Sequence, residues 1–300
     1  MQTGYKYKYL APQALARVGN LRFVARGVVE GMLTGMHASS HKGYSAEFAE
    51  HREYVTGDDP RHLDFKKFAK TERLFVKQYE AETNRRVQII LDASGSMAFK
   101  HSVTITKFEY AASLTAVLAY LMIKQQDSVG LTLFDTEIRL DIPVKNSPRH
   151  FYEMMEHLET IQPGCQTGIA QTLHRLASRF KKRSLIVLIS DLYDDPDEIA
   201  RALHHFTHHR HEVVLFHVFD RAELDFPFAE SMAFHDLETQ ERVVVHPREM
   251  RNAYLEEVRR FTDHYRRCCG ESGIDYIVTD TTVPYEEMLT RYIAGPRIVQ

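Results

Sequence analysis

From about residue 86, short apolar runs alternate with longer segments in which apolar residues recur every three or four positions. The short runs predict strands over residues 87–91, 129–134, 185–189, 213–219 and 274–278, with 138–142 forming an edge hairpin. The longer segments predict helices over residues 107–123, 168–180, 249–269 and 285–293. Unbroken apolar strands between helices are typical of a mainly parallel sheet that helices cover on both faces. The pattern therefore predicts a doubly wound α/β fold with an antiparallel edge.

The same pattern divides the chain into two parts. Residues 84–300 carry the alternation and predict one α/β domain, in which 223–245 adds a hairpin before the long helix. Residues 1–83 lack the alternation and are expected to form an N-terminal segment packed on that domain. Within this segment, residues 1–50 predict an irregular arm with one helix, because apolar residues recur at nearly helical spacing over 15–24.

Composition and charge narrow the class of protein. The formal net charge of −3 gives no electrostatic reason to bind nucleic acid or an anionic membrane. Two of the three cysteines are adjacent, so the chain has no disulfide framework and suits a reducing compartment. No signal peptide opens the chain, and its longest apolar-looking stretch, over 114–123, is far shorter than the ~20 residues of a membrane helix. We therefore expect a cytoplasmic protein that does not insert into a membrane.

Two predicted strands end on carboxylates. Asp92 follows one apolar run and Asp191 follows another. Parallel strands place their carboxyl ends at one edge of the sheet, which is where open α/β sheets bind ligands. A carboxylate at the end of a buried strand is costly unless it is paired or holds an ion. Ser94 and Ser96 follow Asp92 closely, and Gly95 between them is expected to let the loop turn so that both hydroxyls face inward.

These oxygen-bearing side chains suit a divalent metal ion. Thr167 adds a further hydroxyl in a loop just before a predicted helix. Hard oxygen ligands with part of the water shell retained are what Mg²⁺ prefers, although Mn²⁺ or Ca²⁺ is also compatible. Hydroxyls that bind the ion directly, with carboxylates held through water, would leave one position open. We expect an Asp or Glu of a partner protein to fill that position.

The motif resembles the metal-ion-dependent adhesion site of von Willebrand factor A domains. In that site an Asp-x-Ser-x-Ser sequence after the first strand is joined by a distal Thr and a distal Asp. All the elements are present here in the same order, as Asp92, Ser94, Ser96, Thr167 and Asp191. The resemblance implies a von Willebrand A-like domain with a Mg²⁺ site.

The segment over 47–65, followed by Phe75-Val76-Lys77 and Glu80, resembles the signature of a bacterial family named only as domain of unknown function 58. The resemblance covers about residues 40–290, with Phe65 where Trp is common and Lys70 where Arg is common. It implies a non-enzymatic adaptor that works with an AAA+ ATPase of the MoxR type in protein maturation or complex assembly. From the residues alone, the carboxylate-rich run over 57–64 indicates either a salt-bridged turn that fixes the arm on the sheet or a partner-binding surface.

Other interpretations of the same residues are open. Ser94 and Ser96 could cap the next segment, Thr167 could be a helix N-cap, and Asp191 could form an Asx-turn. The chain would then be a metal-free structural subunit.

Two further hypotheses involve histidine. A Mg²⁺-dependent hydrolase could use Asp92 or Ser94 as nucleophile with His217 or His235 as base, although the common hydrolase motifs are absent from the sequence. A separate cluster, His204, His208 and His211, would share one helix face, as a Zn²⁺ site or as an exposed polar surface.

Overall fold

The computed structural model describes residues 9, 46–54, 64–71, 73–81, 85–164, 168–230, 232–235 and 242–294. The chain forms two compact units, one comprising Met32–Asn84 and the other containing Arg85–Gln300. The predicted helix within residues 1–50 lies outside the described residues. The packing of residues 1–83 on the α/β domain stays a prediction.

The smaller unit is built on a two-stranded antiparallel sheet. Strands β1 (Ala46–Glu53) and β2 (Phe75–Ala81) flank helix α3 (Phe65–Thr71) in the sequence. Asp64 accepts a hydrogen bond from the Lys67 backbone nitrogen at 3.0 Å and so caps α3. Asp64 ends the carboxylate-rich run predicted as a turn or partner surface, and residues 57–63 of that run lie outside the described residues.

The larger unit is a six-stranded sheet in the order β10-β7-β6-β3-β4-β5. All neighbouring strands are parallel except β4 and β5, which are antiparallel, so the predicted mainly parallel sheet with an antiparallel edge is confirmed. The strands are β3 (Arg86–Asp92), β4 (Ser128–Phe134), β5 (Ile138–Lys145), β6 (Leu185–Ser190), β7 (Glu212–Phe219) and β10 (Asp275–Asp280).

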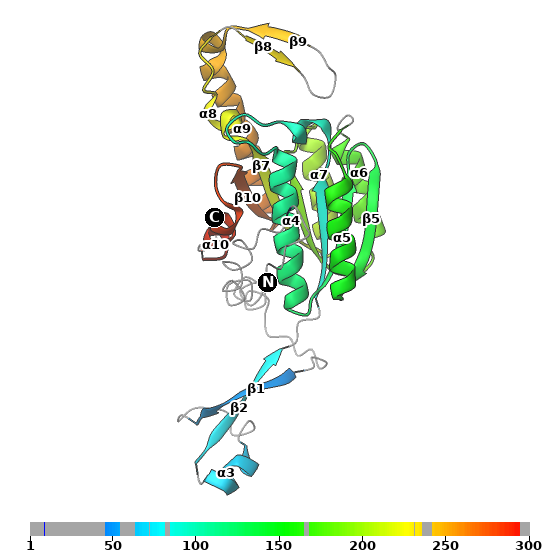
Figure 1. Cartoon of the computed structure of the whole chain (residues 1–300), viewed down its shortest axis with the longest axis vertical. Coiled ribbons are helices and arrows are strands. Elements are labelled where there is room, and N and C mark those ends of the chain that lie inside the picture. The colour runs from blue at the N-terminus through cyan, green and yellow to red at the C-terminus, as the bar shows by residue number, and fades with distance from the viewer. Residues whose placement is uncertain are drawn as a thin grey trace, which may run out of the picture. The chain divides into compact units, whose positions relative to one another are not determined.

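Helices cover both faces of this sheet, as predicted. Helices α4 and α5 lie on one face in Figure 1, whereas side chains of α6, α7 and α9 pack with the strands in a core on the other. The helices are α4 (Lys107–Lys124), α5 (Pro148–Thr160), α6 (Ile169–Arg179), α7 (Pro196–His208), α9 (Pro247–Glu271) and α10 (Tyr285–Ala294). Helix α5 was not among the predicted elements, although Phe151, Met154, Met155 and Leu158 recur at helical spacing and are buried.

The predicted excursion before the long helix is also confirmed. Short helix α8 (Arg221–Asp225) follows β7, and strands β8 (Met232–His235) and β9 (Arg242–Val245) then form an antiparallel hairpin. In Figure 1 this hairpin extends beyond α8 and the start of α9, clear of the six-stranded sheet.

The strand order fixes where the chain reverses direction across the sheet. From β3 the chain continues to β4 and β5 on one side, and later passes to β6, β7 and β10 on the other. The switch point therefore lies between the carboxyl ends of β3 and β6, which carry Asp92 and Asp191. This is the crevice in which open α/β sheets bind ligands.

Within the described residues, none of the helices has the length and apolar character that a membrane span requires.

Substitution of Gly130 in β4 tests how closely the neighbouring atoms pack against this strand. A Cβ at Gly130 would collide with Gln88 Oε1 and lie 2.8 Å from the Ile142 carbonyl oxygen. We expect Gly130→Ala to lower the free energy of unfolding by about 1–3 kcal/mol, because the strand backbone cannot move aside freely. The control is Gly270→Ala in α9, where a Cβ meets open space and should raise that free energy by up to ~1 kcal/mol. Urea denaturation measures both, and a neutral Gly130→Ala would contradict the close approach.

Candidate metal centre

The loop after β3 holds the Asp92 carboxylate in a fixed orientation. Asp92 is fully buried, and one of its oxygens accepts a hydrogen bond from the Ser94 backbone nitrogen at 2.9 Å. Its other oxygen accepts from the Ser190 hydroxyl at 2.5 Å. Ser190 ends β6, so this contact joins the two strand ends at the switch point.

The hydroxyls of Ser94 and Ser96 lie 3.1 Å apart. In an octahedral Mg²⁺ shell with oxygens about 2.1 Å from the ion, adjacent ligand oxygens are separated by about 3 Å. The serine pair therefore has the spacing of two neighbouring Mg²⁺ ligands. Ser94 precedes a 3-10 helix, η3 (Gly95–Ala98), but among the described residues its side chain makes no capping hydrogen bond to that helix. The capping role considered for Ser94 is therefore not seen in this part of the chain.

The loop turns at Gly95 as expected, but not through a left-handed glycine. Gly95 lies inside η3, whereas the described glycine with a positive φ is Gly273. The loop turns through the 3-10 helix, because backbone hydrogen bonds from Met97 to Ser94 and from Phe99 to Ser96 close it.

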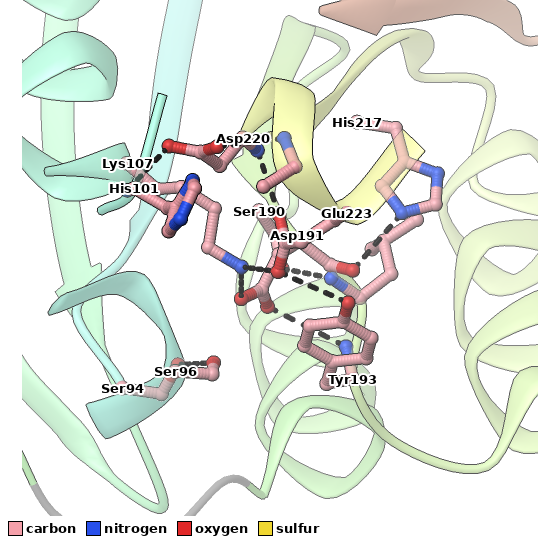
Figure 2. A network of polar contacts seen from close by, with 12 residues as sticks. Ser94, Ser96, His101, Lys107, Ser190, Asp191, Tyr193, His217, Asp220 and Glu223 are labelled. Atoms are coloured by element: carbon pink, nitrogen blue, oxygen red, sulfur yellow. Dashed lines mark hydrogen bonds and ion pairs between the residues drawn. The ribbon is translucent and has the colours of Figure 1, made fainter. Parts of the chain in front are cut away.

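Asp191 is joined to a buried lysine that the sequence analysis did not identify. Lys107 Nζ lies 2.8 Å from Asp191 Oδ2 and 2.8 Å from Glu223 Oε1, and the side chains of Lys107 and Asp191 are fully buried. The Tyr193 hydroxyl also donates to Glu223 Oε1, at 3.1 Å. We call Lys107, Asp191, Glu223 and Tyr193 the Lys107 network, and the loop that carries Ser94 and Ser96 the serine loop. Figure 2 shows the lysine reaching the two carboxylates.

One signal in the sequence could have pointed to Lys107. It is the first residue of α4, where the positive end of the helix dipole disfavours a cation. A lysine at such a position is expected to have an acidic partner elsewhere in the fold. The partners are 84 and 116 residues away, so the sequence alone could not identify them.

The two aspartates at the switch point differ in their charged neighbours. Burial alone would lower the pKa of Lys107, but Asp191 and Glu223 raise it, so the ammonium stays charged. Burial and the charge of Asp191 raise the pKa of Asp92 to about 7. Among the described residues, no lysine or arginine forms an ion pair with Asp92. A further cation beside Asp92 and the serine hydroxyls would balance this carboxylate.

The backbone after Asp191 is strained. Leu192 is fully buried and has φ = 58°, a left-handed conformation that costs a residue other than glycine about 1–2 kcal/mol. Its backbone nitrogen donates to the Ser190 hydroxyl at 2.9 Å, whereas the Tyr193 nitrogen lies 3.5 Å from Asp191 Oδ1. The alternative interpretation of Asp191 as an Asx-turn residue therefore rests on a long contact, and the main partner of its side chain is Lys107.

His217, one of the two histidines proposed as a base, uses both ring nitrogens in contacts away from the serines. His217 is fully buried, and its Nε2 lies 2.9 Å from the Asp191 carbonyl oxygen, which can only accept, so Nε2 carries the proton. Its Nδ1 then accepts from the Tyr276 hydroxyl at 2.7 Å. Burial lowers the pKa of His217 to about 3. Both ring nitrogens are thus used in fixing β6 against β10. His235 lies in β8.

Thr167, the fifth residue of the predicted site, lies outside the described residues. The next residue, Gly168, is the N-cap of α6, so the cap falls one position after Thr167. A Cβ at Gly168 would lie 3.0 Å from the Cα of Thr136, so the chain passes close to the β4–β5 turn here. The structure therefore brings Asp92, Ser94, Ser96 and Asp191 to one sheet edge, and leaves Thr167 as a prediction.

The expectation that three histidines share a helix face was wrong. Helix α7 ends at His208, and Arg210 then takes a left-handed conformation with φ = 62°. His211 is buried, where its Nδ1 accepts from the Ser184 nitrogen and its Nε2 contacts the Phe180 carbonyl oxygen. His204 and His208 are exposed, as an ordinary polar helix face would be. In the part of the chain that the structure describes, no three His, Cys, Asp or Glu side chains form a metal-binding group.

The chain is similar to several known proteins. The family model described as "Protein of unknown function DUF58" matches residues 50–264. The uncharacterized protein Rv1480 of Mycobacterium tuberculosis is 24% identical over 231 residues, which cover 76% of this chain and 72% of the relative. An aerotolerance-related membrane protein of known structure from Bacteroides fragilis is 21% identical, with a TM-score of 0.47, and covers 70% of this chain and 98% of its own. The VWA domain of SpRpn10 is 12% identical, with a TM-score of 0.40, and covers 71% and 95% respectively.

The chain is thus an α/β protein whose doubly wound sheet carries an Asp-x-Ser-x-Ser loop at its switch point. The family match extends over more than half of the chain. The chain therefore belongs to the DUF58 family.

Substitution of Lys107 tests how much its two buried ion pairs stabilise the fold. Lys107→Met leaves the buried Asp191 and Glu223 carboxylates without their cation, so we expect the free energy of unfolding to fall by about 3–5 kcal/mol. Lys124→Met, at the exposed end of the same helix, is the control and should change it by less than about 0.5 kcal/mol. Chemical denaturation at neutral pH measures both values. Equal effects of the two substitutions would show that the buried ion pairs contribute little.

Proposed function

We propose that this protein is a non-enzymatic module that binds other proteins through a divalent metal ion. The observation that carries the proposal is the pair of serine hydroxyls 3.1 Å apart beside the buried Asp92 carboxylate. Their spacing suits two neighbouring ligands of Mg²⁺, and the carboxylate supplies the negative charge that attracts the ion.

Each residue of the site has a distinct part in this proposal. Ser94 and Ser96 would hold the ion directly, together with Thr167. Asp92 and Asp191 would hold its water ligands, since the Asp92 oxygens already accept hydrogen bonds from Ser94 and Ser190. The ion, when bound, offers an electrophilic position to a carboxylate from another protein. Mg²⁺ is the expected ion, and Mn²⁺ or Ca²⁺ is compatible with the same oxygen ligands.

The proposed partners are of two kinds. An acidic segment of a protein ligand would complete the metal shell. An AAA+ ATPase of the MoxR type would work with the module in protein maturation or complex assembly. Membership of the DUF58 family supports this second partner through the resemblance described above. The interaction is expected in the cytoplasm, where ATP is available.

The Lys107 network favours a second candidate function, that of a metal-free structural subunit. Lys107 already forms a buried ion pair with Asp191. In a metal site of this type, the charge of Asp191 would instead help to balance the charge of the ion. In this second function the serine loop would only shape the sheet edge. The two candidates differ in whether the protein binds Mg²⁺ at all.

Calorimetric titration of Mg²⁺ into EDTA-treated protein separates these candidates. We expect one ion per chain, and Ser96→Ala should weaken the affinity by at least ~10-fold because it removes a direct ligand. Ser96 is only half-buried, so the variant should stay folded. Ser178→Ala, on the exposed face of α6, is the control and should bind as the original chain does. Absence of Mg²⁺ binding, repeated with a partner present, would favour the structural subunit.

The ATPase partner is tested by a separate measurement. A MoxR-type AAA+ ATPase from the same organism should bind this protein in the presence of Mg²⁺ and nucleotide, and Asp92→Ala should reduce that binding by at least ~10-fold. Circular dichroism of the variant controls for loss of fold. Equal binding by the folded Asp92→Ala variant would separate the ATPase interaction from the metal centre.

A further inference from the structure

An aromatic pocket of about 300 Å³ lies beside the candidate metal centre. Its walls come from η3, the loop after β6, α8, the β8–β9 hairpin and the start of α9. The residues that line it are Phe99, Tyr193, Ala222, Glu223, Phe226, Phe228, Phe234, Val245, Met250 and Tyr254. The pocket therefore gathers side chains from segments that are far apart in the sequence.

The pocket shares a wall with the metal centre. Phe99 follows Ser96 by three residues, and its carbonyl oxygen accepts a hydrogen bond from the Lys107 backbone nitrogen at 3.0 Å. Tyr193 and Glu223 belong both to the pocket and to the Lys107 network. A ligand that reached the serine loop would thus have the pocket next to it.

The carboxylate at the pocket wall, Glu223, already has its hydrogen-bond partners inside the protein. Glu223 Oε1 accepts from Lys107 and from the Tyr193 hydroxyl, and Glu223 Oε2 accepts from the Asp220 nitrogen at 2.7 Å. A charged group that entered would lose its water without gaining a partner among these atoms, which is costly. The pocket therefore suits an apolar occupant.

The aromatic rings are held in a fixed arrangement. Phe226 has φ = 46°, a left-handed conformation, directly after α8. Its ring centroid lies 4.4 Å from that of Tyr254, 5.2 Å from that of Phe228 and 6.1 Å from that of Phe234. Backbone strain of this kind persists where the surrounding contacts enforce it, and it gathers at binding sites.

The apolar surface continues from the pocket onto the hairpin. Side chains alternate between the two faces of a strand, so Val243 shares a face of β9 with Val245, and it pairs with Phe234 across the hairpin. Val243 is 55% exposed, and Met250 at the pocket mouth is 49% exposed. An apolar path thus leads from solvent into the pocket.

We propose that the aromatic pocket takes an aromatic or branched aliphatic side chain from the same partner segment whose carboxylate reaches the metal centre. This inference rests on the proposed function, and it adds the sequence character of the partner. The partner segment would carry an acidic residue and, at a fixed offset, a large apolar residue.

A display library of random seven-residue segments is the probe. Selection against the full chain, in Mg²⁺ and separately in EDTA, should enrich segments that combine Asp or Glu with Phe, Leu, Ile or Val at one offset, and only in Mg²⁺. Enrichment of acidic residues without an apolar preference would overturn the inference. So would apolar enrichment that is equal in EDTA, or no enrichment.

Matched variants then locate the bound side chain. Met250→Glu places a charge at the pocket mouth and should weaken binding of a selected peptide by at least ~10-fold. Val244→Glu, on the opposite face of the hairpin and 68% exposed, should leave binding unchanged. Equal effects of the two variants would overturn the assignment. A dimer in light scattering that only Met250→Glu dissociates would also overturn it, because a second copy would then occupy the pocket.

Mg²⁺ titration of the same proteins separates this inference from the proposed function. Met250→Glu should keep the Mg²⁺ affinity of the original chain, since Met250 is outside the metal centre. If the original chain binds Mg²⁺ and shows no apolar preference in its peptides, the pocket inference fails alone. If it binds no Mg²⁺ with or without the selected peptides, the proposed function fails as well.

Discussion

The buried ammonium of Lys107 is the constraint on which this sheet edge depends. It joins three elements that are distant in sequence: the start of α4, the end of β6 and α8. The start of α4 is itself fixed, because Thr106 and Glu109 form a capping box around it. Breaking a buried ion pair leaves an uncompensated charge, so the three elements are held in one arrangement. The same lysine forms an ion pair with Asp191 but not with Asp92, whose carboxyl lies beside the serine hydroxyls.

Most of the sheet could be predicted because burial on both faces leaves a plain signal in the sequence. The runs that became β3 and β6 are apolar throughout, and right-handed crossovers require their carboxyl ends to meet at one edge. The sequence alone therefore predicts that Asp92 and Asp191 lie close together. The sequence pattern does not predict the Lys107 network around these two aspartates. Lys107 and Glu223 lie in different helices 116 residues apart, and their pairing depends on how α8 closes over the strand ends.

The errors in the prediction have local physical causes. His211 was placed on a helix face by its spacing, but α7 ends at His208 and the left-handed Arg210 turns the chain so that His211 is buried. Gly95 was expected to be needed for its conformational freedom, whereas the loop turns through a 3-10 helix. In both cases the local turn of the backbone decided the outcome. The aromatic pocket was not predicted, because its residues come from five separate segments.

The antiparallel edge strand β5 has a consequence for how copies of this protein meet. A free edge of a sheet presents unpaired backbone groups that can recruit a strand from another molecule and begin aggregation. In β5, Pro143 removes one backbone donor, and the exposed Arg139 and Lys145 add like charges along the rim. Strand-to-strand growth at β5 is therefore discouraged. This edge is thus a poor template for a strand from a second copy of the chain.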